Sequence, residues 1–371
     1  MANVHLGAAK KAKQDEFYTQ YADIEKEMNA YLEYNPDVFR GKTILLPCDD
    51  PEWSNFTRYF AQNFETFGLK KLISTSYAPN SKPIDVNYQP PLFEIESEKF
   101  DEKKTRSNGK IFTLTQDVTG DQKINVDDLE WSYLEGDGDF RSEEVTKLRD
   151  ESDFIITNPP FSLFREFLAW IIDGGCQFSI IGNMNAITYK ETFPLIKENR
   201  MWIGPSINSG DREFEVPESW ATRSKSLRLE NGKKYLRVDG VRWYTNIQHG
   251  KRHQELPLMT MDDNIKFSKH KEVKDVGYQK YVNFDGIDVP FTDAIPSDYS
   301  GAMGVPISFL NKYNPEQFEI LGSSGELGDR ISLFAPPGSY QQGGPSFYVE
   351  NGDGTYTRLY KRIVIRNRRM A

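Results

Sequence analysis

Cysteine and histidine are scarce in this sequence of 371 residues, which contains two cysteines and four histidines. Cys48 and Cys176 each lie inside an apolar run, so we expect two buried thiols in a reducing cytoplasm rather than a disulfide. The histidines show no paired spacing, whereas a zinc site needs clustered ligands. We therefore expect a cytoplasmic protein that needs no metal.

The sequence also lacks a long hydrophobic run. No segment approaches the roughly 20 apolar residues that a membrane-spanning helix requires. The N-terminal residues include lysines but no apolar stretch behind them, which excludes a secretory signal. Aromatic residues, by contrast, are plentiful, with 24 Phe, 19 Tyr and 6 Trp available to build a core. We expect a folded protein without membrane contact that is long enough for two domains.

A net positive charge, which nucleic-acid-binding domains usually carry, is missing as well, because the net charge is −9. The charges are unevenly distributed, however. Residues 85–153 hold 19 acids and 9 bases, whereas residues 223–275 hold 13 bases and 7 acids. Residues 358–369 contain six Arg or Lys and no acid. A basic C-terminal third suits a surface that faces phosphates, although ordinary solvated charge would give the same pattern.

Strand-like and helix-like segments alternate over the first 200 residues or so. Short apolar runs at 42–48, 69–76, 153–157 and 177–182 are typical of buried parallel strands. Apolar residues at helical spacing predict helices at 18–34, 54–64 and 163–173, with Asp50 or Ser54 as the cap of the second. Residues 79–110 are polar and rich in proline, and we interpret them as an exposed insertion. This order predicts an α/β fold with a largely parallel sheet.

The alternation of strand-like and helix-like segments ends at about residue 205. Short β-like pieces there are separated by Gly, Asp and Pro, which is typical of a loop-rich domain. We interpret the first of these pieces as a hairpin that closes the sheet. The domains that we expect are residues 1–250 and residues 251–371.

The strongest local signal is Asn158-Pro159-Pro160-Phe161, which directly follows a buried strand. In open α/β sheets, ligands bind at the carboxyl ends of the strands, so these four residues are the candidate catalytic residues. The alternative interpretation is a turn that merely ends the strand, since Asn and Pro are common in turns.

These residue types suit the transfer of a methyl group to the N6 amino group of an adenine. The lone pair of that amine is delocalised into the ring, and acceptors aimed at its two hydrogens make the nitrogen more nucleophilic. The Asn158 side-chain oxygen and the Pro159 carbonyl can be these acceptors, and two prolines fix the backbone. Phe161 offers a flat face on which a base can stack. An adenine in a duplex would have to be flipped out to reach them.

Four segments together resemble the adenine-specific DNA methyltransferase family typified by the EcoRI methylase. They are residues 15–20 (DEFYTQ), 48–51 (CDDP) with 54–56 (SNF), 136–142 (GDGDFRS) and 158–161 (NPPF). They occur in the order found in the family, and weaker matches continue at 243–246 and 304–322. The resemblance implies a doubly wound, Rossmann-like sheet, S-adenosylmethionine as cofactor and a C-terminal target-recognition domain.

The resemblance also implies which residues bind the cofactor. Residues 17–19 resemble the segment that closes over its methionine part, and residues 48–51 stand where most such enzymes have a glycine-rich turn. Asp49 or Asp50 could pair with its ammonium group, although both could simply cap a helix. Asp139 and Phe140 resemble the adenine-binding segment, with an acidic surface turn as the alternative. The full set is Phe17, Tyr18, Thr19, Cys48, Asp49, Asp50, Pro51, Asp139, Phe140 and Asn158.

Aromatic and basic residues interleave further along the chain, which suits contact with a flipped base and its phosphates. These candidate DNA-binding residues are Trp243, Tyr244, Asn246, Lys251, Arg252 and His253. The alternative is that Trp243 and Tyr244 alternate between the two faces of a strand, with one of them in the core.

Residues 117–128 have oxygen-bearing side chains at calcium-loop spacing. However, Gln122 stands where the sharp turn requires glycine, and Thr119 replaces an acid. We therefore predict no calcium site.

Together these features predict direct methyl transfer to an adenine in double-stranded DNA by a monomer. The context would be restriction-modification or protection of host or phage DNA, and a separate cognate restriction endonuclease could accompany the protein. Two alternatives remain at this point. The acceptor could be RNA or a protein glutamine, or the chain could be a DNA-binding homologue without catalysis.

Overall fold

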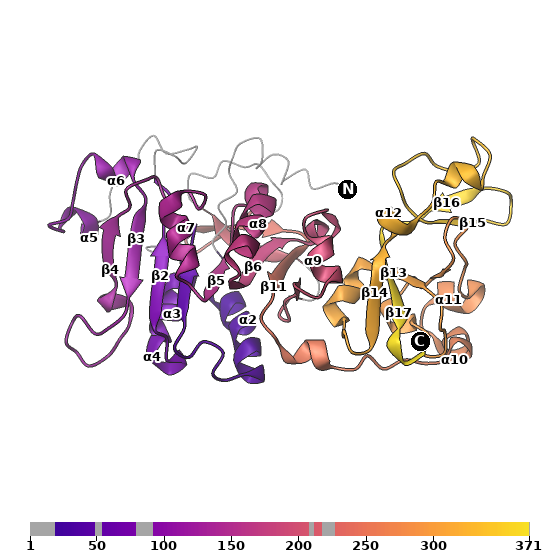
Figure 1. Ribbon diagram of the computed structural model, residues 1–371, viewed down its shortest axis with the longest axis horizontal. Helices are drawn as coiled ribbons and strands as arrows, with labels where there is room; N and C mark the ends of the chain where they lie inside the picture. Colours follow the sequence, from indigo (N-terminus) through magenta and orange to yellow (C-terminus); the bar gives the residue numbers. More distant parts are fainter. Residues whose placement is uncertain (1–18, 49–53, 79–91, 208–210, 217–226, 371) are drawn as a thin grey trace. The chain divides into compact units, whose positions relative to one another are not determined.

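The computed structural model describes residues 19–48, 54–78, 92–207, 211–216 and 227–370. The chain forms two compact units (Figure 1). The N-terminal unit contains residues 1–193 and 201–249, and the C-terminal unit contains residues 194–200 and 250–371. This division concerns packing, so the catalytic and recognition roles expected of residues 1–250 and 251–371 stay predictions.

The N-terminal unit is built on an eight-stranded sheet with the order β4-β3-β2-β1-β5-β6-β11-β7. Its parallel centre consists of β2 (Lys71–Thr75), β1 (Thr43–Leu46), β5 (Phe154–Thr157) and β6 (Gln177–Asn183). β11 (Val241–Thr245) runs antiparallel between β6 and β7 (Trp202–Ile203). All four predicted strands of the parallel centre are confirmed, and so is the α/β fold class.

Two strands at the edge beside β2 were not expected. They are β3 (Lys110–Leu114) and β4 (Glu130–Tyr133), and both are antiparallel to their neighbours. β3 (KIFTL) buries every second residue and β4 (EWSY) buries none, so neither shows the continuous apolar run of a parallel strand that is covered on both faces. The closing hairpin is only partly as expected. β11 joins the sheet beside β6, with β7 as the edge strand outside it. The strand before β11, β10 (Lys233–Val238), lies between β8 (Arg212–Val216) and β9 (Leu227–Glu230) in a separate sheet.

The predicted helices are present, and their ends follow local chemistry. α2 (Tyr21–Tyr34) ends at Asn35, and α8 (Phe164–Gly174) ends at Gly175, whose φ of 68° glycine adopts without strain. Ser54 caps α3 (Asn55–Gln62) by accepting hydrogen bonds from the amides of Phe56 and Thr57. The other helices of this unit are α4 (Phe64–Phe67), α5 (Leu92–Ile95), α6 (Lys104–Ser107), α7 (Glu143–Asp150), η2 (Val126–Asp128), η3 (Phe161–Leu163) and η4 (Met184–Thr188), while α9 (Phe193–Lys197) begins where the two units divide.

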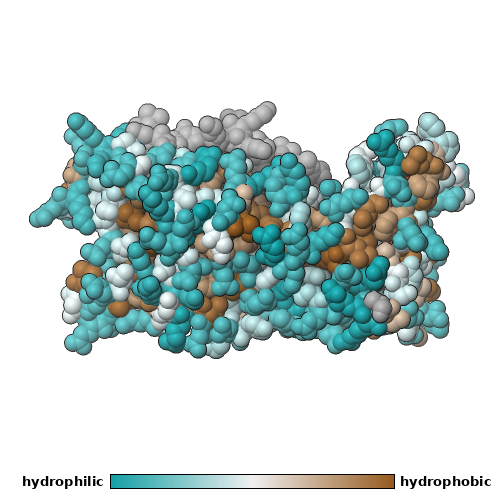
Figure 2. Space-filling view, viewed as in Figure 1, coloured by the Kyte–Doolittle hydropathy of each residue, from teal (hydrophilic) through white to brown (hydrophobic). Residues whose placement is uncertain are grey.

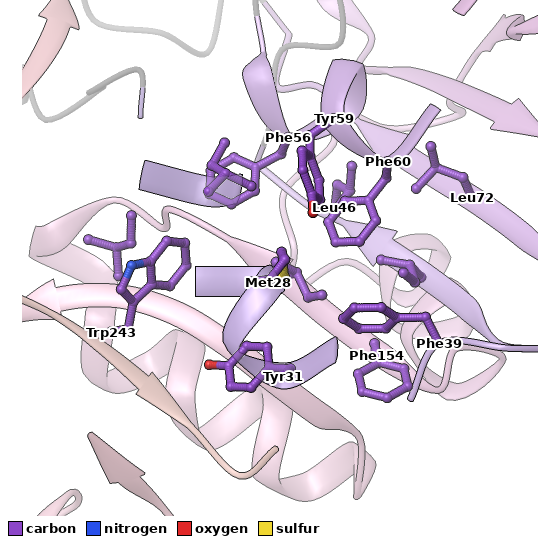
Figure 3. Close-up of a cluster of buried hydrophobic side chains, with 14 of the residues drawn as sticks. Met28, Tyr31, Phe39, Leu46, Phe56, Tyr59, Phe60, Leu72, Phe154 and Trp243 are labelled. Atoms are coloured by element: carbon purple, nitrogen blue, oxygen red, sulfur yellow. The ribbon is translucent and has the colours of Figure 1, made fainter. Parts of the chain in front are cut away.

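Alternating side chains of the central strands bury against helices on both faces of the sheet. One face joins the core cluster of α2 and α3, where Met28, Phe60 and Phe154 converge (Figure 3). On the other face, the ring of Phe164 in α8 lies 5.2 Å from the ring of Tyr244 in β11. This three-layer arrangement is the doubly wound sheet that we expected.

The C-terminal unit contains a four-stranded sheet with the order β12-β13-β17-β14. Its strands are β12 (Ile287–Asp288), β13 (Met303–Pro306), β17 (Arg362–Asn367) and β14 (Phe318–Ser323), and β15 (Tyr348–Glu350) pairs with β16 (Tyr356–Arg358). Its helices are α10 (Met261–Phe267), α11 (Lys271–Val276), α12 (Ser324–Leu327), η5 (Gly250–His253), η6 (Thr292–Ala294), η7 (Ile307–Lys312), η8 (Ile331–Leu333) and η9 (Arg368–Met370). Among the described residues of both units, no helix is long and apolar enough to cross a membrane.

A buried ion pair ties this sheet together. Arg362 and Asp288 lie 2.8 Å apart with side chains only 12% and 10% exposed. The Tyr281 hydroxyl donates to Asp288 at 2.8 Å, and burial followed by the Asp288 charge raises the pKa of Tyr281 well above its ordinary value. Tyr281 therefore remains a neutral donor that helps to satisfy the buried carboxylate.

Replacing Asp288 by Ala should lower the free energy of unfolding by about 3–5 kcal/mol, because the substitution leaves Arg362 buried without its partner. Urea denaturation of the purified protein measures the loss. The matched control is Asp37→Ala, which breaks the Arg40–Asp37 pair, where both side chains are more than 60% exposed. This control should lose no more than about 1 kcal/mol. Equal losses in the two variants would contradict a structural role for the buried pair.

Candidate active site

The carboxyl ends of the central parallel strands meet at one edge of the sheet. From β1 the chain continues to β2, which pairs with one side of β1, whereas β5 pairs with the other side. The carboxyl ends of β1 and β5 therefore form a topological switch point of the sheet. The Thr157 hydroxyl at the end of β5 donates to the Pro47 carbonyl after β1 at 2.7 Å. This bond holds together the two segments that flank the switch point.

The segment Asn158-Pro159-Pro160-Phe161 directly follows β5 and so begins at the carboxyl ends of the parallel strands. A residue that precedes proline avoids helical geometry, so two prolines in succession keep the chain extended until η3 begins at Phe161. Pro159 is buried, whereas Asn158, Pro160 and Phe161 are half-buried. Phe161 packs against the core cluster of the unit. The four candidate catalytic residues therefore lie together where a ligand of this fold binds.

The 136–142 segment reaches the same edge from beside β2. Gly138 has a φ of 83°, and a Cβ atom there would lie 2.1 Å from the Ser76 carbonyl oxygen. The amide of Ala78 donates to the Asp137 carbonyl at 2.7 Å. Only glycine allows this approach, which places Asp139 next to the residues that follow β2.

Asp139 is held as a carboxylate at this edge. Arg141 donates from its Nε and Nη2 atoms to the two Asp139 oxygens at 2.9 and 2.7 Å, and it pairs with Glu166 of α8 at 3.0 Å. These hydrogen bonds hold the pKa of Asp139 below its ordinary value. Burial, followed by the charges of Asp137 and Asp139, raises the pKa of Tyr77 to about 12. The neutral Tyr77 hydroxyl donates to Asp139 at 3.4 Å. At neutral pH Asp139 is therefore an ionised carboxylate held by both Arg141 and Tyr77.

Phe140 does not occupy the position that the resemblance implies. Its ring is 3% exposed and packs 5.0 Å from the ring of Phe167 and 5.6 Å from that of Trp170. A ring that is only 3% exposed has no free face on which an adenine could stack. We correct the expectation accordingly, since the structure gives Phe140 a packing role that fixes the loop carrying Asp139.

Two buried hydroxyls at the carboxyl edge lack a hydrogen-bond partner among the described residues. They are the Oγ1 atoms of Thr19, before α2, and of Thr75, at the end of β2. Asn55, at the start of α3, donates to the Thr19 carbonyl at 2.8 Å and so ties this segment to the site. Both hydroxyls are therefore suited to hydrogen bonds with a polar ligand.

Cys48 closes the β1 strand in an unusual conformation. Its φ of 62° lies in the left-handed region, which costs a non-glycine residue about 1–2 kcal/mol. Cys48 therefore adopts the geometry that a glycine-rich turn supplies elsewhere, and such strain is common at functional sites. The remaining predicted cofactor residues, Phe17, Tyr18, Asp49, Asp50 and Pro51, lie outside the residues that the structure describes.

Two of the predicted DNA-binding residues belong to the interior instead. Trp243 and Tyr244 are both fully buried in β11, and Trp243 packs 6.1 Å from Phe56. Because β11 is an inner strand covered on both faces, these two side chains cannot reach DNA, and we correct that expectation. Asn246, just after β11, is half-buried; it accepts from the Phe178 amide at 2.7 Å and donates to the Cys176 carbonyl at 3.2 Å, and its contact with DNA stays a prediction.

The basic residues that follow lie on η5 of the C-terminal unit. Arg252 is 3% exposed and donates to Asn199, and burial lowers its pKa to about 10, so it still carries its charge. Its burial contradicts a direct phosphate contact. His253 lies 3.4 Å from Glu316 at the surface, and Lys251 is half-buried. A contact between DNA and either Lys251 or His253 stays a prediction.

The acidic side chains of the 117–128 loop accept hydrogen bonds from backbone amides of the same loop. Asp128 accepts hydrogen bonds from the amides of Val118, Thr119 and Asn125, which lowers its pKa to about 2. Asp117 accepts from the amides of Gly120 and Gln122. In the part of the chain that the structure describes, no group of three or more His, Cys, Asp or Glu could hold a metal.

Sequence reasoning missed Thr75, Tyr77, Arg141 and Glu166. Thr75 and Tyr77 could have been found, since they end or follow a predicted strand at the edge where ligands bind. Arg141 and Glu166 could not, because their pairing depends on how the 136–142 loop packs against α8.

The chain matches a known family over residues 5–368, described as adenine-specific methyltransferase EcoRI. It is 42% identical to the Type II methyltransferase M.EcoRI of Escherichia coli, over 86% of this chain and 89% of that relative. It is 31% identical to the Type II methyltransferase M.MpnI of Mycoplasma pneumoniae, over 85% of each chain. A Mycoplasma genitalium relative, M.MgeORF184P, is 33% identical over the same shares. No solved structure matches the chain significantly.

Replacing Trp243 by Ala should lower the free energy of unfolding by about 3–5 kcal/mol, because it leaves a cavity between β11 and α3. The urea midpoint measures this change, and nitrocellulose filter binding measures DNA affinity of the folded variant, which should stay unchanged. The control is Val118→Ala at a side chain 52% exposed, which should stay within about 0.5 kcal/mol. Lost DNA affinity with an unchanged midpoint would restore the base-contact interpretation.

Proposed function

Because the chain belongs to the EcoRI family of adenine-specific DNA methyltransferases, it is an enzyme that methylates adenine in DNA, and we propose that the site at the carboxyl edge performs this reaction with S-adenosylmethionine. The observation that carries the proposal is the position of Asn158 and Pro159 at the switch point. Membership of this family also favours DNA over RNA or a protein glutamine as the acceptor.

The residues around the edge fit the proposed cofactor. When bound, S-adenosylmethionine supplies a methyl group on a positively charged sulfur. The unsatisfied hydroxyls of Thr19 and Thr75 are suited to its polar groups, and the ionised Asp139 can accept a hydrogen bond from its adenine amine. We propose that Cys48 and residues 17–18 and 49–51 also bind the cofactor. Tyr77 supports the set by donating its hydroxyl to Asp139 at 3.4 Å.

Asn158 and Pro159 act on the substrate amine. The Asn158 side-chain oxygen and the Pro159 carbonyl accept hydrogen bonds from the two hydrogens of the adenine N6 amine. These bonds strengthen as positive charge develops on the nitrogen, so they stabilise the transition state more than the ground state. Pro160 fixes the direction of the chain, and Phe161 stacks on the base. The adenine reaches these groups by flipping out of the duplex.

The remaining features concern the setting of the reaction. We propose that residues 251–371 recognise the target sequence. Lys361 and Arg358 are exposed cations of the basic segment 358–369 that support this proposal, whereas Arg362, Arg366 and Arg369 pair with acids. We further propose a monomer in the cytoplasm that needs no metal and serves restriction-modification or protection of host or phage DNA. A separate cognate restriction endonuclease would then cut unmodified sites.

Replacing Asn158 by Ala should reduce methylation at least 100-fold, because one of the two amine acceptors is lost. The measurement incubates protein with mixed-sequence duplex DNA and S-adenosylmethionine, then quantifies N6-methyladenine by mass spectrometry of the nucleosides. Calorimetry measures cofactor affinity separately, because Asn158 also belongs to the predicted cofactor-binding residues.

The matched control is Asn35→Ala. Asn35 is exposed at the C-terminus of α2, before β1 begins, and therefore lies at the opposite edge of the sheet. Its activity should equal that of the wild type. Full activity in Asn158→Ala would contradict the proposed role of this residue. The absence of N6-methyladenine from wild-type reactions would contradict the proposed reaction.

Replacing Gly138 by Ala should weaken S-adenosylmethionine binding at least tenfold. A Cβ atom at this left-handed position would lie 2.1 Å from the Ser76 carbonyl, so the loop carrying Asp139 must move. Gly136→Ala is the control, because its Cβ would meet only Glu144, at 3.9 Å. Calorimetry compares both variants with the wild type, and equal affinities in all three would contradict a cofactor role for this loop.

A further inference from the structure

Three charged side chains connect the loop that carries Asp139 to the helix α8. Arg141 donates from Nε and Nη2 to the two Asp139 oxygens, and from Nη1 to a Glu166 oxygen at 3.0 Å. The Arg141 amide also donates to Asp139 at 2.8 Å. A planar guanidinium that binds two carboxylates through different nitrogens fixes the separation between them. We call Asp139, Arg141 and Glu166 the charged bridge.

The helix at the far end of the charged bridge is continuous with the catalytic segment. Phe161, the last residue of that segment, begins η3, and α8 begins at Phe164 directly after η3. The Phe164 ring packs so closely on β6 that a Cβ atom on Gly182 would lie 2.4 Å from it. The start of α8 is therefore fixed on the sheet, and Glu166 lies in its first turn.

The charged bridge is not required for folding. Arg141 and Glu166 are 52% and 57% exposed. Figure 2 shows mostly hydrophilic residues on the visible surface of the N-terminal unit, where exposed ion pairs are ordinary. Such a pair contributes at most about 1 kcal/mol to stability. The packing of Phe140 on α8 already attaches the loop, so the bridge adds the orientation of the Asp139 carboxylate.

We propose that Arg141 and Glu166 are positioning residues for methyl transfer. They fix the Asp139 carboxylate, and with it the adenine end of the bound cofactor, relative to Asn158 and Pro159. The rate of a transfer step depends steeply on the placement of the two reacting atoms, and a displacement of about 1 Å can slow a reaction about 100-fold. This inference rests on the proposed function and deepens it, because it adds two residues that act through Asp139.

The first test is Glu166→Ala, which removes one end of the charged bridge and leaves the Asp139–Arg141 pair in place. Single-turnover methylation, with S-adenosylmethionine and a duplex that wild type methylates both at saturation, should slow about fivefold or more. Cofactor affinity from calorimetry should stay within about twofold, because Asp139 keeps its partner. Glu166→Gln keeps an acceptor oxygen for Arg141 and should recover most of the lost rate.

The matched control is Glu143→Ala. Glu143 lies in the first turn of α7, as Glu166 does in α8, and it pairs with the exposed Lys147 at 2.8 Å. Each substitution removes one negative charge, one exposed ion pair and one favourable interaction with a helix N-terminus, but only Glu166 belongs to the charged bridge. Glu143→Ala should match wild type in rate, and all variants should share its thermal unfolding midpoint.

A double-mutant cycle separates the charged bridge from independent effects. Arg141→Ala should slow methylation and also weaken cofactor binding, because Asp139 loses its two-point partner. Adding Glu166→Ala to this variant should cause no further slowing, because the bridge is already broken. A Glu166→Ala rate equal to that of the control, or slowing that adds in the double variant, would overturn the positioning role. A wild type that methylates no duplex would instead overturn the proposed function.

Discussion

The parallel pairing of β1 with β2 on one side and β5 on the other is the constraint on which the site depends. Because these strands run in the same direction, the residues that follow them gather at one edge. Cys48, Tyr77 and Asn158 are far apart in sequence, and only this topology brings them together. The bond from Thr157 to the Pro47 carbonyl then fixes the two segments at the switch point.

The electrostatics of that edge follow from how Asp139 is held. Arg141 joins its carboxylate to Glu166 of α8, so the charge of Asp139 is kept while the loop is attached to the helix that follows the catalytic segment. Tyr77 remains neutral beside it. An ionised carboxylate suits a positively charged methyl donor, whereas a cationic site would repel it.

Burial separates aromatic residues that build the fold from those available to a partner. Trp243 and Phe140 lie in segments that looked functional in the sequence, yet both are covered by neighbouring rings. Phe161 of the catalytic segment, by contrast, is only half-buried. The net charge of −9 likewise hides local differences, because it sums an acidic segment at 85–153 and a basic one at 223–275.

The sequence by itself determined the parallel strands, the helices with their caps, the NPPF segment at a strand end and the family, because apolar periodicity, capping chemistry and short motifs are local properties. Tertiary structure alone decided the edge strands β3 and β4, the Arg141 pairing, and the positions of Trp243 and Phe140. Each of these depends on which residues distant in sequence come to cover a side chain or a strand edge. Local pattern records that a residue is apolar or charged, and only packing decides whether it faces the core or a partner.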